Sequence, residues 1–460
     1  MTLQPLKEIL HQLPPDVLRQ LDKFVQSPYF VTHDGVLRLY AYLRKHILDT
    51  DALEHAAVYQ HLFPDGKEDP KRVYHLSHYL REAVEQFLAL EEMRRDENAL
   101  HCATTAALRR LKLNDEAASM IRYAHKRLEK DEKRGAAYFH SDHRLQLESH
   151  LLLLQKGKSQ SMHLQALSDS QDVAFIVDKL RTGCIMLSQR TVQETTYASG
   201  LLRPILDFLK NHPFLKIPIV AVYYHGYHAQ KGGENSENHF QSLKKHIEEH
   251  GLQFATNEIQ DLSLMALNYA IGRLNRGEDR YFREVFELYQ SGLAHGALLE
   301  NGQLSRWTYN NITATALRLK EYNWLEQFLI IYQPLLPENH RDSAFHFNMA
   351  RYCYDLGKRR EALGHLLHRE YDNVLQNLQS RVLMCKIYFE LDEWDVLDYQ
   401  IDSLQIYLRR QKGLGYHRGI YGNIARLLRK LVNSNDKSRL RTEIEAMPEL
   451  PEKEWLLRQV

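Results

Sequence analysis

Histidine is the residue type whose spacing in this chain comes nearest to a site for chemistry. Of the 25 histidines, His246 and His250 in the segment HIEEH are four residues apart on one helical face, a spacing that two metal ligands can share. Metalloproteases of the H-E-x-x-H type carry a glutamate base directly after the first histidine, but Ile247 stands there. Two further pairs are three residues apart: His225 and His228, and His140 and His143. We expect solvated polar faces with no bound metal and no cofactor, because two histidines are not a closed ligand set.

Other chemical motifs are incomplete. The Gly-Lys-Ser of QKGKSQ (155–160) needs a glycine five positions before Gly157 to form a phosphate loop, and Leu152 is there. The segment GLGYHRG (413–419) lacks the preceding strand that a dinucleotide site requires. The four cysteines form no C-x-x-C pair: Cys102, Cys184, Cys353 and Cys385. No spacing assembles a nucleophile, a base and an orienting group, so we expect no enzyme, although a Cys–His pair formed in space stays open.

A basic segment near the C-terminus is the most unusual feature of the charge pattern. Across residues 409–441 its cations are accompanied by Asp436 alone, in a chain whose net charge is +1. The cations are Arg409, Arg410, Lys412, Arg418, Arg426, Arg429, Lys430, Lys437, Arg439 and Arg441. Such a local positive surface suits phosphates or an acidic partner, so nucleic-acid binding is one hypothesis for the function. The alternative interpretation is a solvated helix face.

Composition indicates an ordinary globular protein. Of the 460 residues, 44% are hydrophobic and 26% are charged, and the length favours two or three compact units or one extended array. The N-terminus lacks the apolar stretch of a signal peptide, and the longest apolar run, IPIVAVYY (217–224), is too short to span a membrane. Together with four scattered cysteines, this predicts a cytoplasmic protein without membrane contact.

The elements that would position these residues are helices throughout. Prolines lie mostly between helical patterns, and we interpret 217–224 as a buried helix. A lysine- and glutamate-rich stretch (126–135) suggests a boundary between an N-terminal helical region, 1–135, and a helical repeat array, 136–460. We detect no repeat in 1–135, where the segments SPYF (27–30) and LFP (62–64) resemble those of uncharacterised bacterial helical proteins.

The repeat is clearest in NMARYCYDLGKRREALGHL (348–366). Shifted 35 residues downstream it aligns with 381–401, and shifted 37 residues upstream it aligns with 309–329. A weaker copy covers 266–289. The positions between the two helices of each copy are Gly277, Lys320, Gly357 and Asp392. A period of about 34 residues with two helices per unit predicts an all-α fold of helical hairpins stacked as a solenoid.

This pattern resembles the tetratricopeptide repeat, well for 343–376, fairly for 306–341 and 378–408, and weakly for 140–300. Ala350 and Ala362 stand where the two helices of that family's hairpin cross, and Gly357 stands at its turn. Two residues depart from the family's pattern: His346 replaces a tryptophan, and Asp392 replaces the turn glycine.

The resemblance implies that the first helix of each hairpin lines a concave groove. The matching groove positions are Asn310, Ala314, Arg318, Phe347, Arg351, Tyr354, Val382, Lys386 and Phe389. Aromatic and cationic side chains together suit an extended peptide or an acidic tail, although some of these aromatics could instead belong to the core. We therefore expect a monomeric or weakly dimeric scaffold that binds a protein or peptide partner, with nucleic-acid binding through 409–441 as the alternative.

Overall fold

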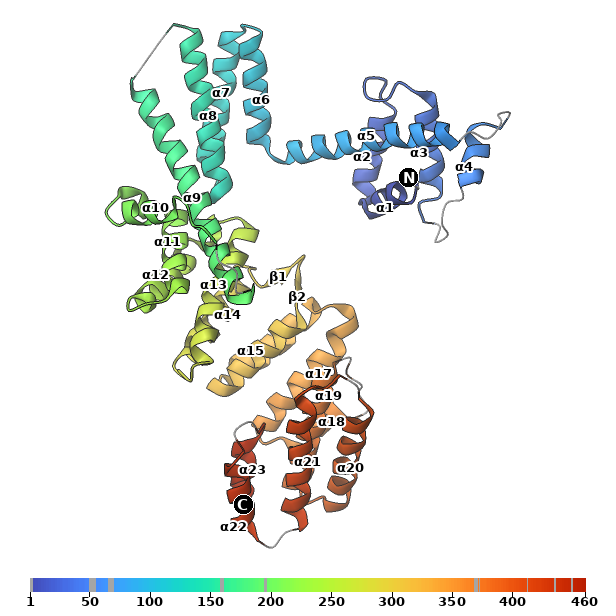
Figure 1. Cartoon of the computed structure of the whole chain (residues 1–460), viewed down its shortest axis with the longest axis vertical. Helices are drawn as coiled ribbons and strands as arrows, with labels where there is room; N and C mark the ends of the chain where they lie inside the picture. The colour runs from blue at the N-terminus through green and yellow to red at the C-terminus, as the bar shows by residue number, and fades with distance from the viewer. Residues whose placement is uncertain are drawn as a thin grey trace. The chain divides into compact units, whose positions relative to one another are not determined.

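The computed structural model describes residues 3–48, 55–64, 70–157, 161–193, 197–367, 371, 373–411, 413–433, 436–447 and 450–460. The chain forms two compact units, 1–132 with 137–174, and 133–136 with 175–460. The described residues are helical apart from turns and one pair of two-residue strands, which confirms the all-α prediction (Figure 1). None of the described helices combines the length and apolar composition needed to cross a bilayer.

The first unit begins with a small helical core. Five helices build it: α1 (Gln4–Gln12), α2 (Pro15–Val25), α3 (Asp34–Lys45), α4 (His55–Leu62) and α5 (Pro70–Arg95). The leucine stripe of α2 is buried with those of α1, α3 and α5, and Leu10, Leu21 and Leu39 are fully buried. Burial of each such side chain contributes about 1.5–3 kcal/mol. Helix α2 starts at a proline, whose fixed backbone angle suits the first helical position.

The rest of the first unit is built from longer helices, two of which form a hairpin. Its helices are α6 (Glu97–Arg110), α7 (Asn114–Lys130), most of α8 (Ala136–Gln155) and the first part of α9 (Ser161–Gln193). Between α6 and α7, Lys112 adopts a left-handed conformation with φ 62°, and the Leu113 amide donates to the Leu108 carbonyl at 3.0 Å. This is the Schellman ending typical of helices. One such turn is not a repeat, so the interpretation that residues 1–135 carry no repeat stays a prediction.

The second unit opens with antiparallel helices around a buried α11. These elements are α10 (Leu202–Leu209), α11 (Pro218–Lys231), α12 (Ser236–His250), α13 (Thr256–Leu274) and α14 (Tyr281–Ala294). The segment 219–224 of α11 is buried throughout, which confirms the helix predicted there. Strands β1 (Leu299–Glu300) and β2 (Gln303–Leu304) then pair across Asn301 and Gly302, both with positive φ. The Asn-Gly dipeptide is a hairpin signal that the sequence analysis overlooked.

The clearest repeats form three consecutive hairpins followed by single helices. The hairpins are α15 (Arg306–Leu319) with α16 (Tyr322–Tyr332), α17 (Glu338–Asp355) with α18 (Arg359–Leu366), and α19 (Val374–Glu390) with α20 (Trp394–Arg410). The last three helices are α21 (His417–Asn433), α22 (Lys437–Glu445) and α23 (Lys453–Gln459). Each helix packs against its neighbours in the chain, as in a solenoid (Figure 1).

The turns of the hairpins share one geometry. All four turn positions predicted from the repeat have left-handed backbones: Gly277 (φ 85°), Lys320 (φ 59°), Gly357 (φ 82°) and Asp392 (φ 57°). In each turn the following amide donates to the carbonyl five residues earlier, as from Lys358 to Cys353 at 2.9 Å. These bonds satisfy carbonyls that the end of a helix leaves unpaired. The alignment therefore placed these turns at the correct residues.

The predicted small positions lie in the core. Ala350 of α17 and Ala362 of α18 are both fully buried, and these two helices pack against each other. The equivalent positions of the neighbouring hairpins are also fully buried, and they pair a small residue with a leucine: Thr313 with Leu325, and Cys385 with Leu397. The hairpin of α17 and α18 is thus distinguished by alanine at both positions.

Candidate functional site

Lys386, one of the predicted groove residues, lies at the centre of a set of acidic and aromatic contacts. It lies on α19 with only 6% of its surface exposed. Its Nζ donates to Glu452 Oε2 at 2.6 Å. The same ammonium lies 4.6 Å from the ring centre of Tyr354 and 5.6 Å from that of Trp455. A buried ammonium requires such a counter-charge, and the aromatic faces add cation–π attraction.

Glu390, one turn along α19 from Lys386, organises the adjacent polar contacts. The Tyr354 hydroxyl and the Trp455 indole N–H each donate to Glu390 Oε1 at 2.6 Å. Arg359 forms an ion pair with the same carboxylate and lies over the Tyr354 ring at 4.3 Å. Burial, together with the hydrogen bond to Glu390, raises the pKa of Tyr354 well above its ordinary value. The hydroxyl therefore stays protonated and remains a donor.

The C-terminal helix α23 supplies the residues that meet this surface. Glu452, in a left-handed conformation with φ 60°, precedes the helix, and Trp455 lies in its first turn. The Trp455 ring packs edge-on to Phe389 with centroids 5.4 Å apart. The predicted groove residues Lys386 and Phe389 thus contact this segment of the same chain, and the ring of Tyr354 contacts Lys386. Sequence reasoning missed Glu390, Glu452 and Trp455.

The remaining predicted groove residues lie in two separate parts of the structure. The Asn310 side-chain oxygen accepts a 2.6 Å hydrogen bond from the buried Asn348, whose own oxygen accepts from Arg351 at 3.3 Å. Phe347 is only 3% exposed and packs against Tyr371, so it belongs to the core. Arg318 lies away from these residues, 3.8 Å from Asp279 and over the ring of Phe282.

Several cations of the basic segment pair with acids in the structure. Arg426 and Lys430 contact Glu443 at 2.9 and 2.7 Å, and Arg429 contacts Asp402 at 2.6 Å. The hydrogen bond from Lys430 lowers the pKa of Glu443. The partners Asp402 and Glu443 lie just outside residues 409–441, which explains why the segment looked uncompensated in the sequence.

The remaining cations make varied contacts. Arg441 pairs with Glu445 at 3.1 Å, Lys437 donates to the Gln459 carbonyl, and the Arg439 amide donates to Asp436. Arg409 and Arg410 form the last turn of α20, and Arg418 donates to the Gln411 carbonyl. Lys412 lies outside the described residues.

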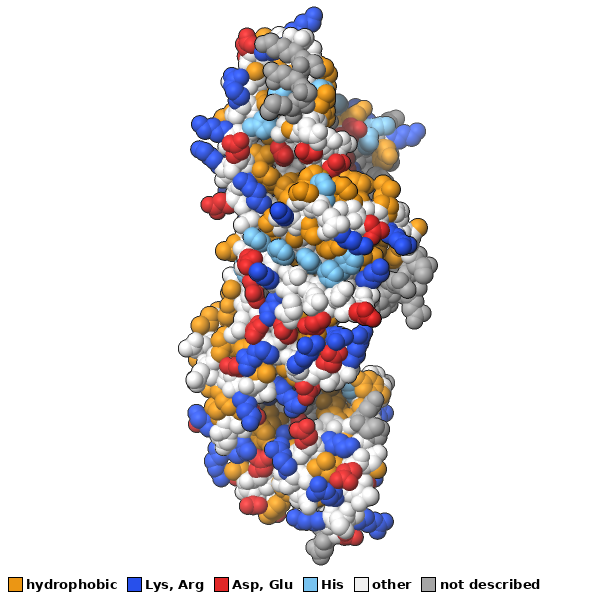
Figure 2. All heavy atoms as spheres, turned by 90° about the vertical axis from the view of Figure 1, so that its left-hand side faces the viewer, with side chains coloured by type: hydrophobic (Ala, Val, Ile, Leu, Met, Phe, Trp, Pro, Cys, Tyr) orange, Lys and Arg blue, Asp and Glu red, His pale blue; other side chains and the backbone are white. Residues whose placement is uncertain are grey.

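Five histidines line the contact between α11 and α12. His225 and His228 come from α11, and His239, His246 and His250 come from α12. Ring contacts run in series, from His228 to His239 (4.6 Å between centroids), to His225 (5.1 Å), to His246 (5.8 Å) and to His250 (5.7 Å). Figure 2, which looks onto the side where α11 and α12 lie, shows histidines gathered in a band. We call this set the histidine row.

Burial is the main cause of the lowered pKa values in the histidine row. It lowers the pKa of His225 to about 4, with neighbouring histidines as the next cause. It also lowers the pKa of His228 to about 4, followed by the charges of His239, Lys231 and Lys210. Burial also lowers the pKa of His239 and of His246. Nδ1 of His225 and Nδ1 of His239 are 2.9 Å apart, so one ring donates and the other accepts. The sequence analysis missed His239 because it compared only histidines within four residues. The spacing of 239, 246 and 250, close to whole numbers of helical turns, could have revealed it.

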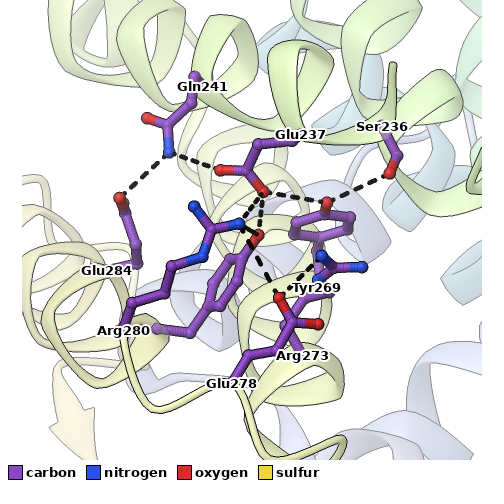
Figure 3. A network of polar contacts seen from close by, with 9 residues as sticks. Ser236, Glu237, Gln241, Tyr269, Arg273, Glu278, Arg280 and Glu284 are labelled. Carbon is purple, nitrogen blue, oxygen red and sulfur yellow. Dashed lines mark hydrogen bonds and ion pairs between the residues drawn. The ribbon is translucent and has the colours of Figure 1, made fainter. Parts of the chain in front are cut away.

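A polar network fixes the start of α12 against α13 and α14 (Figure 3). Glu237 accepts hydrogen bonds from Tyr269 and Tyr281 and pairs with Arg280 at 3.4 Å. Gln241, one turn later, donates to both Glu237 and Glu284 at 3.1 Å. These contacts orient the face of α12 that carries three of the histidines.

A glycine lets α11 approach α13 closely. A side-chain carbon at Gly226 would lie 2.3 Å from the sulfur of Met265, so only glycine fits without movement. Gly226 is directly beside His225 on α11. The backbone beneath the histidine row is therefore fixed by packing.

The four cysteines are poor nucleophiles in this fold. All four are buried and free. Burial raises the pKa of each thiol, to about 11 for Cys102 and about 12 for Cys385. The Cys184 thiol donates a hydrogen bond to the Tyr223 carbonyl, and the Cys353 thiol donates one to the Glu361 carboxylate. A thiol of raised pKa forms little thiolate, the reactive species, near neutral pH.

Comparison with known proteins adds no relative. No protein-family model, no curated protein and no solved structure matches the chain. The functional argument therefore rests on the residues and contacts described above.

Proposed function

We propose that the protein is a non-enzymatic scaffold of the cytoplasm that binds a protein or peptide partner on its C-terminal hairpins. Repeated left-handed turns and the two buried alanines of the α17–α18 hairpin support a tetratricopeptide-like array. In such an array the first helices of successive hairpins form a binding surface, here α15, α17 and α19. Buried thiols of raised pKa agree with a role that is not catalytic.

The observation that carries this proposal is the occupation of the surface by α23. A short helix presents a carboxylate, Glu452, to Lys386 and an aromatic ring, Trp455, to Phe389. Those contacts are of the kind that anchor a peptide ligand: an aromatic anchor, a charge-assisted hydrogen bond and a cation–π contact. A partner segment that carries an acidic residue near an aromatic residue would make the same contacts in place of α23.

A peptide selection on the full-length protein tests this proposal. We expect random-peptide display to enrich sequences that combine acidic and aromatic residues, with affinities then measured by fluorescence anisotropy. Lys386→Glu should weaken binding by about 2 kcal/mol, roughly 30-fold, because it removes the central cation of the surface. Trp455→Ala should strengthen binding, because α23 then competes less for the same residues.

Tyr399→Ala is the matched control, because this aromatic residue of α20 is 70% exposed and outside the surface. Circular dichroism of each variant checks that the helices are retained. Peptides that bind wild type and the Lys386→Glu variant equally, or that lose affinity with Tyr399→Ala, would place the binding site elsewhere and contradict the proposal.

A further inference from the structure

The histidine row has no part in the proposed peptide surface, and its donor atoms are not all used. Nε2 of His228, Nδ1 of His246 and Nδ1 of His250 are buried and have no hydrogen-bond partner among the described residues. A buried polar atom without a partner costs about 1–3 kcal/mol. Imidazole nitrogens without hydrogen-bond partners are atoms that a bound metal ion would satisfy.

Three donors at one end of the row converge. His246, Glu249 and His250 each offer one ligand atom, and these atoms all lie within 4.8 Å of one another. In tetrahedral zinc sites with Zn–N bonds of 2.0–2.1 Å, the nitrogens lie about 3.3 Å apart, so modest side-chain rotation closes the set. The ring of His225, from the other helix, stacks on that of His246 at 5.8 Å.

We propose that His246, Glu249 and His250 bind one divalent transition-metal ion of the zinc class. Imidazole nitrogens with one carboxylate suit zinc, nickel or copper, whereas calcium and magnesium require mostly oxygen ligands. All three ligands come from the last two turns of α12. This proposal replaces the expectation from the sequence, where only the pair of histidines was visible.

Two features of the surroundings bear on the site. Lys245 Nζ lies 3.8 Å from Glu249 Oε1 in an exposed ion pair, which contributes little. Glu249 Oε2 lies 3.9 Å from His250 Nε2, so this carboxylate oxygen is already directed at another of the proposed ligands.

Isothermal titration of the metal-free full-length protein with zinc chloride tests the proposal. We expect one saturable site per chain. The double variant His246→Gln/His250→Gln should lose affinity by at least about tenfold, the loss produced even by removing a group that only supports a ligand. Glu249→Gln should lose affinity in the same direction. This second variant keeps the test decisive if the histidine variant unfolds, because Glu249 is exposed and carries no packing role.

The double variant His140→Gln/His143→Gln is the matched control, because it removes a pair of histidines one helical turn apart from another helix, α8. It should leave zinc affinity and the zinc-induced rise in melting temperature unchanged. Absence of a saturable site in the wild type would overturn the proposal. Equal losses in the control and the His246/His250 variant would also overturn it, because zinc would then bind surface histidines at random.

Discussion

The contact between α17 and α18 can be tested by enlarging Ala362. Its side chain is fully buried, as is that of Ala350 on the facing helix. Leucine adds three heavy atoms, and overpacking of a well-packed core costs about 1–3 kcal/mol. In the neighbouring hairpins the position equivalent to Ala362 is a leucine, Leu325 or Leu397. The position equivalent to Ala350 is threonine in the first of these hairpins and cysteine in the second. Ala362→Leu therefore requires α17 and α18 to separate, and we expect a loss of stability in that range.

Gly364→Ala is the matched control two residues further along α18. Two residues rotate the helix by about 200°, which moves this position to the opposite side. A side-chain carbon at Gly364 would meet no atom within 4 Å. Alanine has a higher helix propensity than glycine, so we expect a gain of up to about 1 kcal/mol.

Urea denaturation followed by circular dichroism gives the free energy of unfolding of both variants against wild type. Equal slopes with denaturant would show that the changes reflect stability alone. Hydrogen exchange should localise the loss in Ala362→Leu to α17, α18 and the adjoining hairpins, because neighbouring repeats share their interfaces. An Ala362→Leu variant as stable as wild type, together with a strongly destabilised Gly364→Ala, would refute the assigned register of the repeat.

Three further predictions concern the turns, the basic segment and the thiols. Lys320→Gly should raise the free energy of unfolding by up to about 1 kcal/mol in urea denaturation, because glycine adopts its left-handed backbone without strain. Arg426→Glu with Arg429→Glu should retain the helical circular dichroism signal but weaken any binding of RNA at low salt, measured by filter binding. Native protein at pH near 8 should react slowly with a thiol reagent at all four cysteines, and rapidly once unfolded, because burial raises each thiol pKa and blocks access.

Each of these predictions has a result that contradicts it. If the Lys320→Gly variant is less stable than wild type, the lysine side chain stabilises the fold by more than its strained backbone destabilises it. Unchanged RNA binding in the double arginine variant, or no binding by wild type, would remove the nucleic-acid hypothesis. Rapid labelling of any cysteine in the native protein would show that its thiol is accessible, which contradicts the burial of all four.

The sequence by itself determined the helices and most of their turns. The turn at Gly357 and its alignment with Lys320 and Asp392 were predicted correctly, because a helix ending depends on hydrogen bonds within about six residues. The burial of Ala350 and Ala362 also followed from a local period. The left-handed backbone of Lys112 was not predicted, because lysine seldom adopts that conformation.

Only the tertiary structure decided which distant residues meet. Lys386 and Glu452 are 66 residues apart in the chain, and nothing in either local sequence indicates that α23 covers α19. His225 and His239 likewise meet only because α11 and α12 pack side by side. Helical periodicity specifies the face on which a side chain lies, since that depends on neighbours in the chain. The residue opposite it depends on how two helices pack against each other, which is set by all the side chains between them.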